Sequence, residues 1–264
     1  MRPRRPSLRR TLTSLLILTG FLALGDGARL NAQEGDWEVE TEVAASLYFG
    51  NTSQTTINTQ LSTSRADSAY DLSSAATFAY GEAENSRGES FVAKRAWDVE
   101  ASLDWAPSAR LSPFAFGQGE SSFERRIDFR YNVGGGGKYT FVRNDESRLD
   151  LSLALLGEQT FTSGEVSTSA GSDQEVLARW SLRLRGRREL ADGDVILSSR
   201  NYYRPVLGEY DDYVLETRNS ISYALSEVVS LSFSFLDTYD SEAVARGAET
   251  NNDGQFLLGV IGRF

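Results

Sequence analysis

The chain contains no cysteine and no histidine among its 264 residues. Without cysteine it cannot form disulfides, bind metals through thiolates, use a thiol nucleophile or carry the lipid of a lipoprotein anchor. Without histidine it lacks the commonest general base and the commonest transition-metal ligand. We therefore expect no enzyme activity, no cofactor and no metal site.

Long apolar segments are scarce as well. Hydrophobic residues make up 40% of the chain and the mean hydropathy is −0.35, which disfavours a bundle of membrane-spanning helices. The apolar run from Thr11 to Gly25 has 15 residues, whereas a spanning helix needs about 20. It follows a basic start and precedes Leu30-Asn31-Ala32. We interpret residues 1–32 as a signal peptide cleaved after Ala32, rather than as a membrane anchor.

Removing that peptide takes away six arginines and Asp26 and changes the net charge from −10 to −15. Such an acidic chain is a poor partner for nucleic acid, because binding to phosphates depends on lysine and arginine. The acids gather in the predicted loops. This fits a surface that faces water and divalent cations, and simple solvation explains it equally well.

After residue 33 the sequence shows no helical period but alternates apolar and polar residues. Between Trp37 and Phe49, for example, the odd positions are mostly apolar and the even positions include Glu38, Glu40 and Glu42. We count twelve such runs, at residues 36–49, 54–65, 67–81, 91–105, 110–122, 126–141, 148–162, 175–189, 194–204, 211–225, 228–238 and 254–264. Strands of soluble proteins have about 5–6 residues and membrane-spanning strands about 9–11. The lengths favour a membrane barrel over a long-stranded soluble sandwich.

The connections alternate in length too. They are short after even-numbered strands and longer after most odd-numbered ones, notably at 82–90, 163–174 and 239–253. Bacterial outer-membrane barrels combine an even strand count with short periplasmic turns and longer outer loops. Because lipid offers no hydrogen bonds, a sheet in the membrane must close on itself. We therefore predict that residues 33–264 form one closed antiparallel transmembrane β-barrel in the bacterial outer membrane.

Aromatic residues fall near the predicted strand ends, as expected for residues at the membrane–water interfaces. They are Trp37, Tyr80, Trp105, Phe141, Phe161, Tyr203, Tyr213 and Phe235. The last strand ends in an aromatic residue with apolar residues at alternate positions before it: Phe264, Val260, Leu258 and Phe256. This pattern resembles the signal read by the outer-membrane assembly machinery. We expect that machinery and the membrane lipid to be partners of the chain.

Three segments resemble a known family. They are Gly50-Asn51-Thr52, the stretch IDFRYNVGGGGKYTF at 127–141, and TYDSEAVARGAETNNDGQFLLGVIGRF from Thr238. They are similar to the domain-of-unknown-function-481 family, whose members are described as salt-induced outer-membrane proteins. The resemblance covers nearly all of the mature chain and implies an outer-membrane barrel without catalytic residues. The loop Glu242–Asn252, poor in basic residues, departs from the family pattern.

Charged residues on the inward faces are the candidate functional residues. The basic ones are Arg179, Arg183, Arg185, Arg187, Arg200 and Arg204, and the acidic ones are Glu38, Glu40, Glu42, Asp98, Glu100, Asp104, Asp150, Glu158 and Glu216. If the two groups face each other across the lumen, their field could select solutes. Alternatively, neighbouring charges neutralise one another and fill a narrow barrel.

Counting outward from the hairpin loops predicts which charges are directly opposed. A loop centred at Thr168-Ser169 pairs Glu158 with Arg179 and Asp150 with Arg187. Further counting places Arg183 beside Arg200, and Arg200 beside Glu216.

Two functions remain open. The first is a narrow channel or envelope protein with a small solute or ion as cargo, for which the family resemblance implies a link to osmotic or salt stress. The second is a sealed structural barrel that acts through its loops. Two other patterns favour structural roles. A glutamate ladder in a polar lumen explains Glu38, Glu40 and Glu42 without acid–base catalysis. The glycines Gly134–Gly137 open no helix, so a close approach of another backbone is favoured over phosphate binding.

Overall fold

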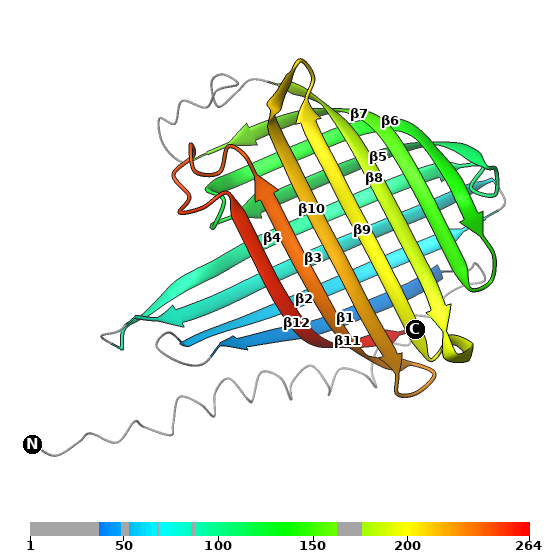
Figure 1. Ribbon diagram of the computed structural model, residues 1–264, viewed down its shortest axis with the longest axis horizontal. Helices are drawn as coiled ribbons and strands as arrows, with labels where there is room; N and C mark the ends of the chain where they lie inside the picture. The colour runs from blue at the N-terminus through cyan, green and yellow to red at the C-terminus, as the bar shows by residue number, and fades with distance from the viewer. Residues whose placement is uncertain (1–36, 49–52, 68, 86–87, 163–175) are drawn as a thin grey trace, which may run out of the picture. The chain divides into compact units, whose positions relative to one another are not determined.

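The computed structural model describes residues 37–48, 53–67, 69–85, 88–162 and 176–264. The predicted signal peptide at 1–32 lies outside these residues and stays a prediction. Within the described part of the chain, twelve antiparallel strands form a closed barrel (Figure 1). They are β1 (Trp37–Tyr48), β2 (Ser53–Ala66), β3 (Tyr70–Glu84), β4 (Ser90–Trp105), β5 (Leu111–Ser122), β6 (Ile127–Arg143), β7 (Ser147–Phe161), β8 (Leu177–Leu190), β9 (Val195–Val206), β10 (Glu209–Ala224), β11 (Val229–Asp240) and β12 (Asn252–Arg263). The predicted fold class is confirmed.

The last strand closes the barrel against the first. β12 lies between β11 and β1 (Figure 1) and pairs with β1 from Glu40–Arg263 to Ala45–Leu258. Phe264 continues this pairing: its N–H donates to the Val39 carbonyl at 2.9 Å, and its carbonyl accepts from the Val39 N–H at 3.1 Å. Both edges of the sheet are therefore satisfied by hydrogen bonds, as a barrel in lipid requires.

The predicted faces of the strands are confirmed by burial. On β12, Phe256, Leu258 and Val260 are exposed on the outer wall, whereas Leu257 and Ile261 on the opposite face are buried. The outward aromatic residues lie at both ends of the barrel. Trp37, Trp105 and Phe141 are at the short-turn end, and Tyr80, Phe161, Tyr203, Tyr213 and Phe235 are on the other half of the wall. Leucines and valines occupy the wall between the two ends, which is the pattern of a membrane-facing surface.

The connections differ in length at the two ends. At one end they cover only 67–69, 106–110, 144–146, 191–194 and 225–228, while the other end carries the longer connections 162–176 and 241–251. We call these the short-turn end and the long-loop end. One predicted long loop is wrong: β3 extends to Glu84 and β4 begins at Ser90, so only 85–89 connect them. No helix in the described part of the chain is long and apolar enough to cross a membrane.

Gly134 and Gly136 on β6 allow close contact with β7. A Cβ atom at Gly136 would lie 2.0 Å from the Leu153 carbonyl oxygen, and one at Gly134 would lie 2.5 Å from the Leu155 carbonyl oxygen. Any side chain larger than hydrogen would force the two backbones apart. These glycines serve a close backbone approach, as the sequence favoured.

Candidate functional site in the barrel lumen

The lumen contains a polar cavity of about 550 Å³. Its lining residues come mainly from the short-turn half of the strands, and serines, glutamines and charged side chains predominate among them. Ten of the predicted lumen charges line it: Glu38, Glu40, Glu42, Glu100, Asp104, Arg183, Arg185, Arg187, Arg200 and Arg204. Arg148, Arg218 and Arg263, which the sequence did not single out, line it as well.

The predicted opposed pairs are wrong by two residues. On β7 and β8, Asp150 is opposite Arg185 rather than Arg187, and Glu158 is opposite Leu177 rather than Arg179. Glu158 and Arg179 nevertheless form an ion pair, at 3.0 Å between Oε1 and Nε, because they are diagonal neighbours. A shift of two residues keeps every side chain on its predicted face.

The predicted row of Arg183, Arg200 and Glu216 is also absent. Arg200 lies opposite Arg185 on β8 and opposite Arg218 on β10. Two local features shift these registers. The turn from β8 to β9 contains a short 3₁₀ segment at Ala191–Gly193, and the register between β9 and β10 shifts irregularly between Glu209 and Tyr213. A bulge of this kind adds unpaired residues to one strand.

Several side chains reach across the lumen. Arg200 Nη1 on β9 lies 2.8 Å from Glu100 Oε1 on β4, and these strands are five apart in a ring of twelve. Arg218 Nη1 on β10 donates to the side-chain amide oxygen, Oε1, of Gln60 on β2. The Arg183 guanidinium lies 5.3 Å from the centre of the Phe114 ring. The basic wall of β8–β10 therefore meets the opposite wall at this level, and the lumen is narrow.

Other predicted charges pair with near neighbours. Asp150 accepts hydrogen bonds from Thr140 at 2.7 Å and from Arg148 at 2.6 Å. Arg204 lies 3.3 Å from Glu216. The remaining contacts are Asp98 with Gln118 at 2.6 Å, Glu42 with Ser232 at 2.6 Å, Glu40 with Arg263 at 3.0 Å, Arg187 with Glu189 at 2.9 Å, and Asp104 with Lys138. Facing walls and neighbour neutralisation therefore both occur, at different places in the lumen.

The long-loop half of the lumen holds a cluster of buried ion pairs, which we call the plug. Its members are Glu120, Arg125, Arg130, Glu158, Arg179, Asp212, Asp240 and Arg246. None of these side chains is more than 13% exposed. Four carboxylates and four guanidinium groups balance in charge, which is the condition for burying ions at tolerable cost.

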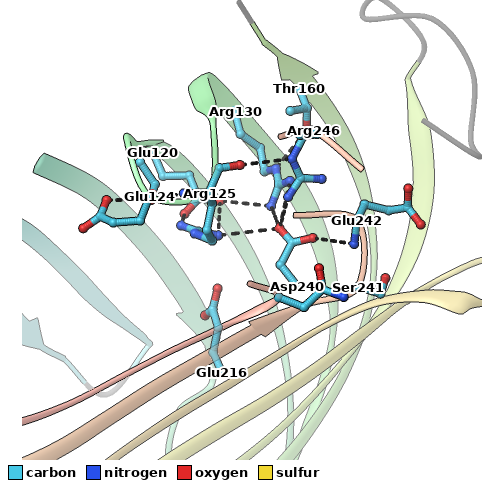
Figure 2. Close-up of polar contacts among 12 residues, drawn as sticks. Glu120, Glu124, Arg125, Arg130, Thr160, Glu216, Asp240, Ser241, Glu242 and Arg246 are labelled. Atoms are coloured by element: carbon cyan, nitrogen blue, oxygen red, sulfur yellow. Dashed lines mark hydrogen bonds and ion pairs between the residues drawn. The ribbon is translucent and has the colours of Figure 1, made fainter. Parts of the chain in front are cut away.

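Asp240 is the centre of the plug. Figure 2 shows Arg125, Arg130 and Arg246 pointing toward its carboxylate. Asp240 Oδ2 lies 2.5 Å from Arg246 Nη2 and 3.3 Å from Arg130 Nη2, and Arg125 Nη1 lies 4.0 Å away. Burial alone would lower the pKa of Arg125 in the turn after β5, but the carboxylates of Glu120 and Asp240 outweigh it and raise that pKa.

A loop supplies part of the plug. The connection 241–251 after β11 folds inward, so that the side chain of Ala243 is fully buried and Arg246 is 6% exposed. Arg246 Nε donates to the Arg125 carbonyl at 3.2 Å, and Arg126 Nε donates to the Gly247 carbonyl at 3.3 Å. The loop is thus fastened to the β5–β6 turn.

The sequence pointed to part of the plug only. Arg130 occupies an inward position of the predicted strand 126–141, so the alternation could have identified it, whereas Asp240 falls in the predicted connection 239–253. Arg246 and Arg125 lie in connections, where no period shows which way a side chain points. Their pairing joins segments about 120 residues apart, which no local pattern reveals. Among the described residues, no group of three or more carboxylates is arranged to hold a metal ion.

Comparison with known families agrees with the fold. A family model described as a protein of unknown function, DUF481, matches residues 41–264. The chain belongs to this family. No curated protein matches the sequence of this DUF481 chain.

Among solved structures, the DUF481 barrel is similar to the NanC porin, with 8% identity, a TM-score of 0.49 and coverage of 86% of this chain and 99% of that chain. It is similar to the COG4313 outer membrane channel from Pseudomonas putida F1, with 14% identity, a TM-score of 0.48 and coverage of 91% and 98%. It is also similar to the KdgM porin, with 13% identity, a TM-score of 0.44 and coverage of 86% and 99%. These likenesses concern the barrel fold alone.

Proposed function

We propose that the chain is a narrow outer-membrane channel that is closed at its long-loop end by the plug. The observation that carries this proposal is the division of the lumen. A polar cavity of about 550 Å³ occupies the short-turn half, while the other half is closed by side chains that include one from a loop. Because the short-turn half already holds a polar cavity, removing the plug would be enough to let ions pass through the lumen.

That barrier can be removed without breaking the barrel. The connection 241–251 contributes no strand to the barrel. At its start Ser241 is bonded to Tyr213 on β10, through its N–H and its hydroxyl. Beyond Ser241 it is held to the rest of the barrel by Arg246 and by the bond from Arg126 to Gly247. Displacing it exposes Asp240 and the guanidinium groups around it to water, which lowers the cost of separating them. In this proposal the connection 241–251 is a gate, and the ion pair of Arg246 with Asp240 holds it closed.

The second candidate is a sealed barrel whose loops alone do the work. The balanced charges of the plug favour it, because four carboxylates and four guanidinium groups can fill a lumen permanently. A link to salt stress, which the family resemblance implies, fits either function.

Single-channel recording in planar bilayers separates the two candidates. For the channel, the wild-type barrel gives brief and rare openings, and Arg246→Ala raises the open probability. The control is Arg188→Ala, which removes an exposed arginine at the short-turn end and should leave the record unchanged. If wild type and Arg246→Ala are both silent while each shows the gel mobility of a folded barrel, the sealed barrel is the correct function.

A further inference from the structure

We infer that Arg185, Arg200 and Arg218 form a binding site for a doubly charged oxyanion inside the lumen. The three residues are directly opposed on the neighbouring strands β8, β9 and β10. Directly opposed side chains have Cβ atoms about 4.5–5.5 Å apart, so the three guanidinium groups form a continuous row. All three line the cavity. As the solute class of the proposed channel this inference rests on the proposed function, but the site itself can be tested without conduction.

The row lacks matching negative charge. Arg200 is paired with Glu100 at 2.8 Å, but Arg218 has the neutral Gln60 as its partner. Arg185 makes no hydrogen bond or ion pair to any residue within the described part of the chain. Like charges placed directly opposite one another destabilise a sheet. Among the described residues, no carboxylate forms an ion pair with Arg185 or Arg218, and Glu100, which is paired with Arg200, is the acid that also attracts Arg218.

Nearby carboxylates are already engaged. Asp150 is opposite Arg185, but both of its oxygens accept hydrogen bonds, from Thr140 and from Arg148. Glu216, two residues before Arg218, lies 3.3 Å from Arg204. Each of these acids therefore has its own positive partner, and the excess charge of the row is about two.

The side chains around the row suit a ligand rather than a structural contact. Arg183, two residues before Arg185, also lacks a carboxylate partner: it donates to Ser152 at 3.3 Å and lies over the Phe114 ring. The planar fork of arginine matches the oxygen spacing of carboxylate, phosphate and sulfate, and charge-assisted bonds of this kind are among the strongest in proteins. A dianion with several oxygens would satisfy the row in both charge and hydrogen bonding.

The plug provides a contrast within the same barrel. There, each guanidinium group lies within 4.0 Å of at least one carboxylate, and Asp240 at the cluster centre does not line the 550 Å³ cavity. The arginine row differs on both points, because it has excess charge and faces the cavity. Excess positive charge in a water-accessible half of the lumen is the signature of an anion site.

Isothermal titration of the purified barrel in an uncharged detergent, at fixed ionic strength, tests the site. Sodium sulfate and disodium succinate serve as the two dianion probes, and sodium chloride serves as the monoanion. We expect one saturable site for sulfate, for succinate or for both, and no saturable binding of chloride. Arg185→Gln and Arg218→Gln should each weaken dianion binding by roughly 10-fold or more, as expected for the loss of a charge-assisted contact.

Arg263→Gln is the matched control, because Arg263 lines the same cavity but is paired with Glu40. It should bind the dianions as the wild type does. Arg185→Lys keeps the charge and loses the fork, so binding between that of the wild type and that of Arg185→Gln supports bidentate contact. No binding of either dianion to the folded wild type overturns the site, and so does equal binding by Arg185→Gln. If wild type and Arg246→Ala conduct no ions but the barrel binds sulfate, the proposed channel function is wrong and the anion site stands. If the barrel conducts but binds neither dianion, only the anion site is wrong.

Discussion

Gly136 on β6 has the least room for a side chain of the glycines that face β7. Its missing side chain is a local requirement, since a Cβ there would overlap the Leu153 carbonyl oxygen and lie 2.6 Å from the Ala154 Cα. Gly117 on β5 has no such neighbour: the nearest atom to a Cβ there is the Asn132 carbonyl oxygen at 3.9 Å. Packing against the neighbouring strand therefore requires glycine at position 136 but not at position 117.

We expect Gly136→Ala to lower the free energy of unfolding by about 1–3 kcal/mol, the usual cost of overpacking. The measurement is the denaturant midpoint of the barrel in detergent or lipid, followed by the change in gel mobility on unfolding. Gly117→Ala is the control and should change the midpoint little. Equal midpoints for wild type and Gly136→Ala would show that β6 and β7 are not in close contact.

At the scale of the strands, the sequence predicted the strands and their faces correctly but predicted the register between neighbouring strands wrongly. All twelve strands, their faces and the closure by the last strand follow from alternation, because the side-chain period of two is set by strand geometry. Register depends instead on the turn and on bulges. The 3₁₀ turn at Ala191–Gly193 and the irregularity between Glu209 and Tyr213 displaced the arginine row by two residues from its predicted partners.

The β7–β8 register can be measured directly because the chain has no cysteine. We expect Asp150→Cys with Arg185→Cys to be joined by a short bismethanethiosulfonate cross-linker in high yield, because these residues are directly opposed. The pair Asp150→Cys with Arg187→Cys is diagonal and should react more slowly. Faster cross-linking of the second pair would restore the register predicted from the loop centre.

The closing strand leads to a prediction about assembly. Phe264 makes two backbone hydrogen bonds to Val39, and its side chain is 77% exposed on the outer wall. Deleting Phe264 removes both bonds and the terminal aromatic ring, so we expect far less heat-modifiable barrel in the membrane fraction. Phe141→Ala, which removes an outward aromatic side chain from β6, is the control. Normal membrane levels of the deletion variant would contradict a role for this residue in assembly.

Considered as a whole, the lumen of the barrel has two halves with different contents. The short-turn half holds the cavity and the arginine row, and the long-loop half holds the balanced plug. The sequence predicted that charges fill the lumen but could not divide them in this way, because Arg246 reaches Asp240 from a connection without periodicity. In our proposal, anion selectivity lies in the short-turn half of the lumen and closure lies in the long-loop half.

The most direct test of this division is the sidedness of thiol labelling at Ser198→Cys, a cavity-lining position on β9. Barrels reconstituted in one orientation are treated with a charged, membrane-impermeant methanethiosulfonate on either side. We predict modification from the short-turn side and none from the long-loop side, with Arg246→Ala opening the second route. Modification of Ser198→Cys from the long-loop side with the plug intact, or protection from the short-turn side, would contradict the division of the lumen.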